Sequence, residues 1–376
     1  MSTMHRAMAM EHSATDVAID NARPRILFVK CEKGGQTWAS GSVSALRDNL
    51  ADEGWPAVRF TAPFESTVDF ARSPFGQLAT SVVAKYKFVR QLINTVQGFN
   101  IVHLQVCDAQ VIARLVLPAL VIAKFFGKKV ILQFVTAEIE KFLDRSGSWS
   151  RPFLKAADRI VVGSRYLEKV AQRARLDAIQ VINPIDLTGL KHRTVSKLQP
   201  RILMDCPLEQ ENNVLCGLKA FRLVKQKYPR SELTVVGNGT QRTMLQHVAA
   251  SNHIHGVRFM DSVNLDELNR FYGHADLFLC SSSIDESPSS IVRAFATGLP
   301  IVTTDSDGLL QMVHDRANAL VVPVNNHVAL ADRIIELIED PSLVTRLSGR
   351  GKDEACKYTW ALVRRSWIGL YSDLAS

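Results

Sequence analysis

Residues 285–305 read Asp285-Glu-Ser-Pro-Ser-Ser-Ile-Val-Arg293-Ala-Phe-Ala-Thr-Gly298-Leu-Pro-Ile-Val-Thr-Thr-Asp305, and this stretch decides the fold. It joins the end of one strand to a helix and then to a second buried strand. Ser287 suits the N-cap of that helix, Pro288 its first position and Gly298 its C-terminal cap. The pattern therefore predicts a strand–helix–strand unit of a parallel α/β sheet.

The start of this helix is predicted to bind an anion. A helix that begins after Pro288 leaves the backbone N–H groups of Ser289 and Ser290 free, and such an end favours a phosphate. Arg293 follows one turn later on the same face. We predict that Glu286, Ser289, Ser290 and Arg293 contact a phosphorylated ligand.

Length and composition describe a globular protein of two domains. The chain has 376 residues, of which 47% are hydrophobic and 22% charged. Its net charge is +8, which serves solubility or attracts anionic substrates or an acidic membrane surface. The basic residues are scattered, and this argues against a nucleic-acid-binding tail.

The cysteines and the N-terminus point to the cytoplasm. The six cysteines lie far apart without metal-binding spacing, as in a reducing compartment. Residues 1–23 lack the apolar core of a signal peptide, and we expect them to form a disordered tail.

The longest apolar run is too short to span a bilayer. It extends from Leu115 to Phe126 and is followed by Lys128 and Lys129. We expect a buried helix here. The alternative is an amphipathic helix at the membrane surface, assisted by the basic residues of the preceding helical segment, which are Lys85, Lys87 and Arg90.

Strands and helices alternate along two halves of the chain, which predicts two doubly wound parallel sheets. The predicted domains are 24–186 and 187–357, followed by a C-terminal segment, 358–376, within a region (327–374) that reads as helices only. The predicted strands are 25–30, 57–61, 101–104, 130–134 and 159–162 in the first domain, and 201–204, 233–236, 257–260, 276–280 and 300–304 in the second.

Ligands of open parallel sheets bind beyond the carboxyl ends of the strands, and glycines follow two of the predicted strands there. Gly34 and Gly35 follow the first strand of the first domain, and Gly237 and Gly239 follow the second strand of the second domain. Glycines at such turns allow a ligand to approach the backbone closely, although many serve as tight turns alone. We include all four as predicted donor-binding residues.

The ordered series of motifs resembles that of GT-B-fold glycosyltransferases, in particular the retaining group known as family 4. The resemblance covers roughly residues 24 to 374 and rests on five segments and the last helix. These are Ala157–Ser164 (family "ADRVIAVS"), Val181–Asp186 ("VIPNGVD"), Leu233–Gly239 ("LVIVGDG"), Ala275–Ser282 ("ADLFVLPS"), Ala294–Val302 ("AMACGLPVV") and Tyr358–Tyr371.

The resemblance implies two facing Rossmann-like domains, with the last helix folded back onto the first. It also implies a nucleotide sugar in the second domain and an acceptor, a glycan or a lipid-linked sugar, in the first. No metal or further cofactor is expected, because in this family an arginine, a lysine and helix N–H groups support the diphosphate. Asp305-Ser-Asp307 is accordingly expected to close a strand as a turn.

Five positions depart from the family pattern, all at the expected active site. Alignment of Ile202–Val214 with "ILFVGRLVPEKGV" places Pro207 at the arginine position and Asn212 at the lysine position. Two family glutamates, with seven residues between them, hold the sugar and the ribose, and here they become Asp285 and Arg293. The histidine expected near the reacting carbon is replaced by Val135.

Arg293 admits two interpretations. In the first it replaces the missing positive charge and contacts a phosphate or an acidic donor such as a uronate. In the second it forms a salt bridge to Asp285 or Glu286, or is solvated.

Asp285 and Glu138 are the predicted catalytic residues. Glu138 and Glu140 follow a strand end, where a carboxylate could act as a general base, although such residues more often begin a solvated helix. His103 lies within an apolar run and is expected to be a packed strand residue.

The sequence thus predicts a metal-independent transferase of polysaccharide or glycolipid synthesis, located in the cytoplasm and in peripheral contact with the membrane through its first domain. The rival prediction is an inactive GT-B protein that binds a partner enzyme or a nucleotide sugar in a synthesis complex. A phosphorylase or epimerase on the same fold is a third and weaker option.

Overall fold

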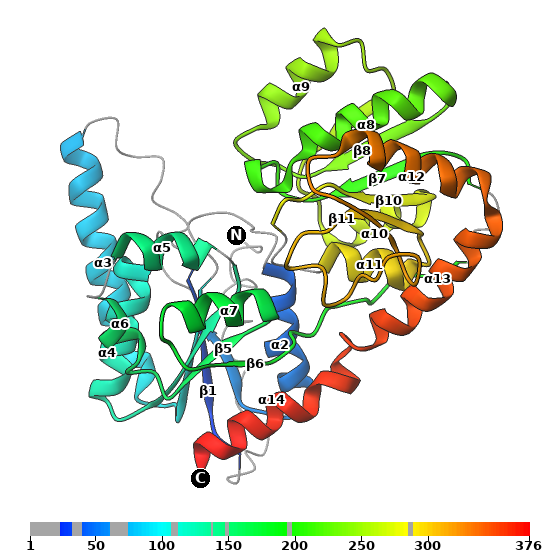
Figure 1. The fold of residues 1–376 in the computed structure, drawn as a ribbon. Helices are drawn as coiled ribbons and strands as arrows, with labels where there is room; N and C mark the ends of the chain where they lie inside the picture. Colours follow the sequence, from blue (N-terminus) through cyan, green and yellow to red (C-terminus); the bar gives the residue numbers. More distant parts are fainter. Residues whose placement is uncertain are drawn as a thin grey trace, which may run out of the picture.

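The computed structural model describes residues 23–31, 40–60, 74–106, 112–136, 138–146, 150–193, 198–284 and 289–376. Two lobes lie side by side in Figure 1, and each is built around a six-stranded parallel sheet with helices on both faces. The predicted fold class, two facing doubly wound α/β domains, is confirmed.

The first sheet has the order β2-β1-β3-β4-β5-β6. Its central strands are buried on both faces, which explains their continuous apolar sequence. The strands are β1 (Ile26–Cys31), β2 (Ala57–Phe60), β3 (Ile101–Val106), β4 (Lys129–Phe134), β5 (Arg159–Val162) and β6 (Ala178–Gln180). The helices are α2 (Ser40–Asp52), α3 (Pro74–Val96), α4 (Leu117–Phe125), α5 (Glu138–Ser146), α6 (Ser150–Leu154) and α7 (Arg165–Arg173), and a π-helical turn at Ile112–Val116 precedes α4.

The second sheet has the order β12-β11-β10-β7-β8-β9. Its strands are β7 (Arg201–Asp205), β8 (Glu232–Val236), β9 (Val257–Met260), β10 (Leu277–Cys280), β11 (Ile301–Thr304) and β12 (Leu320–Val322). The helices are α8 (Val214–Lys227), α9 (Arg242–Ser251), α10 (Leu265–His274), α11 (Ser289–Thr297), α12 (His327–Glu339) and α13 (Pro341–Cys356), with a 3-10 turn at Gln210–Asn212.

The last helix, α14 (Trp360–Ala375), packs against the first domain, as predicted. It is the red helix in Figure 1. Trp367 is fully buried, and its Nε1 donates a hydrogen bond to the carbonyl oxygen of Ile182 at 2.9 Å. His103 of β3 stacks on Trp367, with 5.7 Å between ring centroids. The prediction that His103 is a packed strand residue is therefore confirmed.

Close packing of α13 holds α11 in place. Gly351 of α13 lies so near Phe295 of α11 that a β-carbon there would meet the ring at 2.3 Å. This contact fixes the depth of α11 on the sheet, and therefore the position of its first turn.

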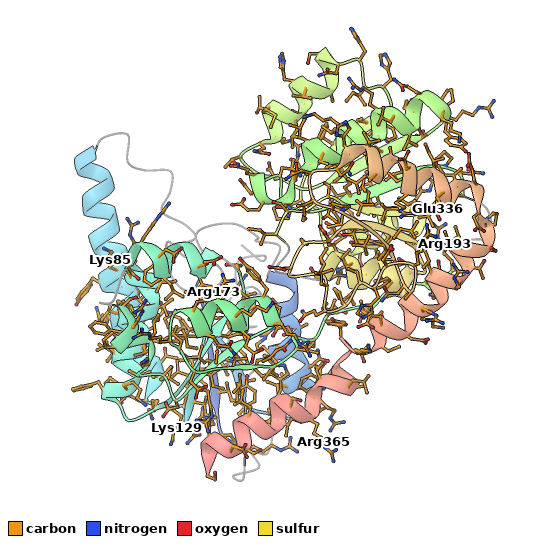
Figure 2. The ribbon with its side chains drawn as sticks, viewed as in Figure 1. Lys85, Lys129, Arg173, Arg193, Glu336 and Arg365 are labelled. Atoms are coloured by element: carbon orange, nitrogen blue, oxygen red, sulfur yellow. The ribbon has the colours of Figure 1, made fainter. Side chains whose placement is uncertain are left out.

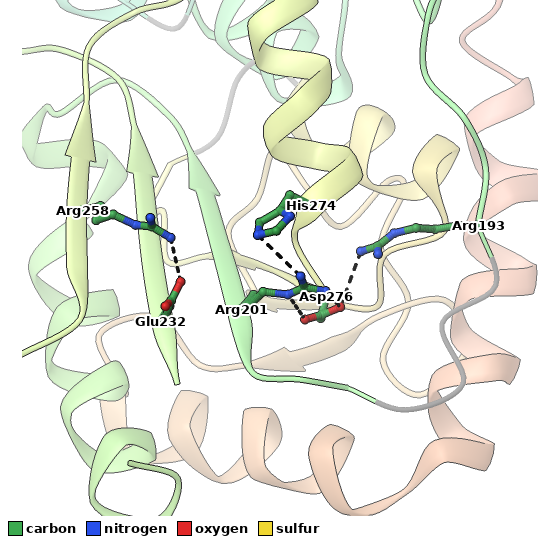
Figure 3. Close-up of polar contacts among 6 residues, drawn as sticks. All are labelled: Arg193, Arg201, Glu232, Arg258, His274 and Asp276. Carbon is green, nitrogen blue, oxygen red and sulfur yellow. Dashed lines mark hydrogen bonds and ion pairs between the residues drawn. The ribbon is translucent and has the colours of Figure 1, made fainter. Parts of the chain in front are cut away.

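A polar cluster stabilises the amino-terminal edge of the second sheet (Figure 3). Asp276 accepts two hydrogen bonds from Arg201, at 2.6 and 2.9 Å, and its carboxylate lies 3.7 Å from Arg193. Arg258 and Glu232 form an exposed pair beside it. Because these contacts lie at the edge opposite the strands' carboxyl ends, their role is to hold the sheet and the interdomain segment.

None of the described helices combines the length and the apolarity needed to cross a bilayer.

Candidate functional site

The loops at the carboxyl ends of β7, β8 and β10 are hydrogen-bonded to one another. Leu208 N donates to the carbonyl of Asn238 at 2.9 Å, which joins the loops after β7 and β8. Ser281 Oγ donates to the carbonyl of Asn213 at 2.9 Å, which joins the loops after β7 and β10. The site is thus built on a rigid frame, at the edge where parallel sheets bind ligands.

Two of the predicted glycines lie in this frame. Gly237 has a φ of 150°. A β-carbon on Gly239 would lie 2.6 Å from the carbonyl oxygen of Leu208. The structure therefore gives Gly239 a packing role between two loops, and its contact with a ligand stays a prediction. Gly34 and Gly35 lie outside the described residues.

A helix, α11, is present where the sequence predicts one. It runs from Ser289, and Gly298 ends it with a φ of 79°, which confirms the predicted C-terminal cap. Asp285 and Glu286, together with residues 287 and 288, lie outside the described part of the chain. Their predicted roles are not tested by the structure.

Arg293 is buried. Its exposed fraction is 7%, and its Nη1 is buried without a hydrogen-bond partner. The interpretation of Arg293 as a solvated arginine is therefore wrong, because the helix packs this face against the sheet. Helical side chains point toward the N-terminus, so the guanidinium lies over the first turn of α11.

A buried carboxylate accompanies Arg293. Asp205 ends β7 with an exposed fraction of 3%, and its Oδ2 accepts a hydrogen bond of 2.6 Å from the hydroxyl of Tyr272 on α10. Burial raises the pKa of Asp205 to about 6, while the Tyr272 hydrogen bond and the charge of Arg293 act in the opposite direction.

Sequence reasoning missed both Asp205 and Tyr272. One signal could have found Asp205, because it is a carboxylate that directly follows the apolar residues Ile202–Met204 at the carboxyl end of a parallel strand. Tyr272 carried no such signal, since its contact depends on how α10 packs on the sheet.

The two residues aligned with the family's arginine and lysine, Pro207 and Asn212, follow β7. Asn212 ends the 3-10 turn, and its carbonyl accepts from Ser281 Oγ at 3.3 Å. Arg242 is near this edge, but its guanidinium already has partners within the protein. Its Nη1 donates to Gly237 O at 2.9 Å and pairs with Asp261. Arg293, by contrast, has a buried Nη1 without a hydrogen-bond partner.

Asp305 serves as a strand-end residue. Its Oδ1 accepts from the backbone N–H of Val324 at 2.9 Å, and its own N–H donates to Val322 O at 2.9 Å. This geometry agrees with the expected turn. Within the described ranges, no group of three or more histidine, cysteine or acidic side chains has the arrangement of a metal site.

The structure describes two of the three residues considered on the acceptor side in full, and the backbone of the third. Val135 is buried directly after β4. Glu138 is the first residue of α5, but its side chain is outside what the structure describes. Glu140 accepts from the Tyr166 hydroxyl at 2.7 Å and pairs with Arg173 at 3.0 Å. Its carboxylate therefore joins α5 to α7.

A cavity of about 530 Å³ lies at the junction of the two domains. The start of α7, the end of β6, the segment after β11, the end of α13 and α14 line it. Gln311 spans the junction, since its Oε1 accepts from Arg165 N at 3.1 Å and from Gln180 Nε2 at 3.3 Å. None of the predicted site residues that the structure describes lines this cavity.

Comparison with known proteins shows what the second domain is similar to. Residues 196–354 match the family model described as glycosyl transferases group 1. The lipopolysaccharide core biosynthesis glycosyltransferase LpsE of Rhizobium meliloti is 31% identical over 190 residues, which are 50% of this chain and 55% of the relative. A phosphatidyl-myo-inositol mannosyltransferase of Mycobacterium leprae is 22% identical over 57% of this chain and 60% of its own. The chain spans about half the length of the curated relatives it matches.

Solved structures agree on the fold over most of the chain. HepE of Anabaena, crystallised in complex with UDP and glucose, has a TM-score of 0.71 at 14% identity and covers 93% of this chain and 100% of its own. Sucrose-phosphate synthase of Thermosynechococcus elongatus has a TM-score of 0.69 at 15% identity, covering 93% and 99%. The chain thus has the GT-B fold, and its residues 196–354 are similar to the glycosyl transferases group 1.

Proposed function

We propose that this protein transfers a sugar from a nucleoside-diphosphate sugar to a glycan or lipid-linked acceptor, without a metal. One observation carries the proposal. Arg293 follows the first turn of α11, is buried and has an Nη1 without a hydrogen-bond partner. A helix start and a guanidinium together favour the diphosphate that leaves when the sugar is transferred.

The chemistry of this step needs positive charge at the leaving group. As the bond to the sugar breaks, negative charge develops on the diphosphate, and donors aimed at it lower the barrier. Each charge-assisted hydrogen bond contributes about 1.5–3 kcal/mol. In place of the missing family cations at Pro207 and Asn212, Arg293 supplies this charge.

The comparisons support a nucleotide-sugar donor and a glycan or lipid acceptor. HepE of Anabaena was crystallised with UDP-glucose as well as with UDP and glucose. The relatives' names place them in lipopolysaccharide core synthesis and in mannosyl transfer to phosphatidyl-myo-inositol. We therefore assign this protein to polysaccharide or glycolipid synthesis. Within that reaction Asp285 and Glu138 stay the predicted catalytic residues.

The proposed metal independence is supported by the structural role of the Asp305 carboxylate. Asp305, the acidic residue nearest in sequence to the end of β11, bonds Val324 N at 2.9 Å. Its role is thereby structural, and the diphosphate is left to Arg293 and the backbone of α11.

Basic and exposed aromatic residues of the first domain support peripheral contact with the membrane. Residues 74–135 contain seven lysines and arginines against one acidic residue. On α3 and α4, Tyr86 is 63% exposed and Phe125 is 83% exposed. Lys85 of α3 and Lys129 of β4 both lie on this domain in Figure 2. Exposed aromatic rings among cations are typical of a surface that binds anionic lipid headgroups.

Vesicle co-sedimentation tests this contact. The protein should bind vesicles with phosphatidylglycerol and not vesicles of phosphatidylcholine alone, and Phe125→Ser should weaken binding several-fold. Leu362→Ser, which removes an exposed apolar side chain from α14, is the matched control. Equal binding to both lipids, or none to either, would contradict the proposed membrane surface.

A panel of nucleotide sugars tests the transferase proposal. A donor that binds the folded state stabilises it by mass action and so raises the melting temperature. At a donor concentration one hundred times Kd, the free energy of unfolding increases by about 2.7 kcal/mol. We expect stabilisation by at least one nucleoside diphosphate and its sugar. Release of the nucleoside diphosphate in the presence of an acceptor glycan or lipid would then demonstrate transfer. Binding without release supports the rival function, a non-catalytic subunit that binds a nucleotide sugar. The absence of any response rejects the transferase proposal and favours a non-catalytic protein that binds a partner enzyme.

A further inference from the structure

Asp205 and Arg293 belong to one buried cluster of opposite charges. Burial raises the pKa of both Asp205 and Tyr272, and the charge of Arg293 opposes this rise at both groups, as a guanidinium in their neighbourhood would. The Tyr272 hydroxyl bonds Asp205 Oδ2 at 2.6 Å and also lies 3.1 Å from the carbonyl oxygen of Ser290, in the first turn of α11. The cluster therefore connects β7, α10 and the start of α11.

Two atoms of the cluster are unpartnered. Asp205 Oδ1 and Arg293 Nη1 are both buried without a hydrogen-bond partner. A buried charge that is not fully hydrogen-bonded costs stability, and it is retained where it has a function. Since each atom lacks a partner while its opposite charge lies nearby, the two groups compensate each other through space.

The cluster lies at the edge of the sheet where the ligand is expected. Cys280 of β10 pairs with Thr303 of β11. The register of Phe278 with Leu203, continued by two residues, places Asp205 beside Cys280. These three residues form the last row under α10 and α11, and the row before it is apolar: Leu203, Phe278 and Ile301.

We propose that Asp205 is the counter-charge of Arg293 and thereby sets how tightly the start of α11 holds an anionic ligand. The inference rests on the proposed function and assigns to that site a residue outside the predicted set. While Asp205 is ionised, the pair is close to neutral, and a bound diphosphate is attracted mainly by backbone dipoles and the oriented guanidinium. Once Asp205 is protonated or replaced, the cluster carries one net positive charge.

This arrangement limits the affinity of the site for the diphosphate. A unit charge several ångströms from an anion, at an effective dielectric constant of about 20, changes its affinity on the order of ten-fold or more. A weaker hold on the product favours its release, which often limits turnover in such enzymes.

The titratable groups that face Asp205 in the described structure are few. They are Tyr272 on α10, Arg293 on α11, Cys206 next in sequence and Cys280 on β10. The neighbour on β8, Val236, is apolar. Because the pKa of Tyr272 is raised well above its usual value, Tyr272 does not change charge between pH 5 and 8. A change in anion affinity with the pKa of Asp205, about 6, therefore reports Asp205 itself.

The test compares Asp205→Asn with the wild type by isothermal titration from pH 5 to 8, with UDP-glucose and inorganic pyrophosphate as probes. The ratio of the two dissociation constants cancels any titration of the probe. At pH 8 the variant should bind on the order of ten-fold more tightly, and at pH 5 the ratio should approach one, because the wild-type carboxyl is then protonated. Asp205→Val, which removes the charge differently, should change affinity in the same direction.

Asp276→Asn is the matched control. Asp276 is also a buried aspartate of the second domain with arginine partners, but it lies at the opposite edge of the sheet. Its ratio should stay near one at every pH. Variants of Asp205 that bind as the wild type does, or more weakly, at pH 8 would overturn the inference. If pyrophosphate follows the expected ratio while no nucleotide binds, the proposed function fails and the counter-charge stands; if neither probe binds, both fail.

Discussion

The hydroxyl of Tyr371, near the end of the chain, lies 2.7 Å from Nδ1 of His103 in the centre of the first sheet. The two residues are 268 positions apart, and both are fully buried. Burial lowers the pKa of His103 to about 3, so the imidazole is neutral and the contact is a hydrogen bond between uncharged groups. The chain thus crosses between the domains twice, and α14 completes the core of the first.

Trp367→Ala should destabilise the first domain strongly. The side chain is fully buried and donates to Ile182 O, so its loss leaves a cavity and an unpaired carbonyl. We expect a loss of about 3–5 kcal/mol in urea unfolding. Leu362→Ala on the exposed side of the same helix should cost less than about 0.5 kcal/mol. Equal effects of the two variants would contradict the packing of α14.

Gly351→Ala should destabilise the second domain although alanine is the better helix former. A β-carbon would meet the Phe295 ring at 2.3 Å, and overpacking costs about 1–3 kcal/mol. Gly349 lies in the same helix with no atom within 4 Å of its β-carbon position. Gly349→Ala should therefore add up to about 1 kcal/mol of stability. Thermal unfolding of the two variants measures the difference, and a stabilising Gly351→Ala would show that α11 and α13 pack less closely.

Asp276→Ala should cost about 2–3 kcal/mol of unfolding free energy, since it leaves Arg201 and Arg193 without their buried partner. Glu232→Ala breaks the neighbouring but exposed pair with Arg258 and should cost less than about 1 kcal/mol. Chemical denaturation measures both. A Glu232 effect as large as that of Asp276 would contradict the assignment of the buried pair as the structural one.

Asp205 should make the stability of the protein depend on pH in the acidic range. Its pKa is raised to about 6 in the folded protein from about 4 in the unfolded chain. The stability gained from its proton is therefore complete below about pH 4 and is lost as the pH rises through 6. The free energy of unfolding of Asp205→Asn, minus that of the wild type, should grow between pH 4 and 6.5 and stay constant above pH 7. Parallel curves would show that the carboxyl is not buried.

The sequence predicted the architecture because most strands and helices have a local residue pattern that identifies them. Apolar strands, the helix between Ser289 and Gly298 and the order of the motifs are all readable without knowledge of the packing. The short strands β6 and β12 were not predicted, since three residues are too few to show an alternation of apolar and polar side chains. The Asp205–Tyr272 contact was not predicted, because it joins residues 67 positions apart and depends on how α10 packs on the sheet.

For Arg293, the sequence predicted one property and not another. Its position on the helix face over the first turn followed from helical spacing. Its burial did not, since that depends on α11 packing against the sheet and on the compensating carboxylate of β7.

The most direct test of the account measures the affinity of a nucleoside diphosphate for Arg293→Gln. If Arg293 supplies the positive charge of the donor site, UDP or the best nucleotide of the panel should bind about 10–100-fold more weakly than to the wild type. Arg270→Gln, which removes an exposed arginine from α10, should bind like the wild type. An Arg293→Gln protein that is folded and binds the nucleotide with unchanged affinity would contradict the central claim.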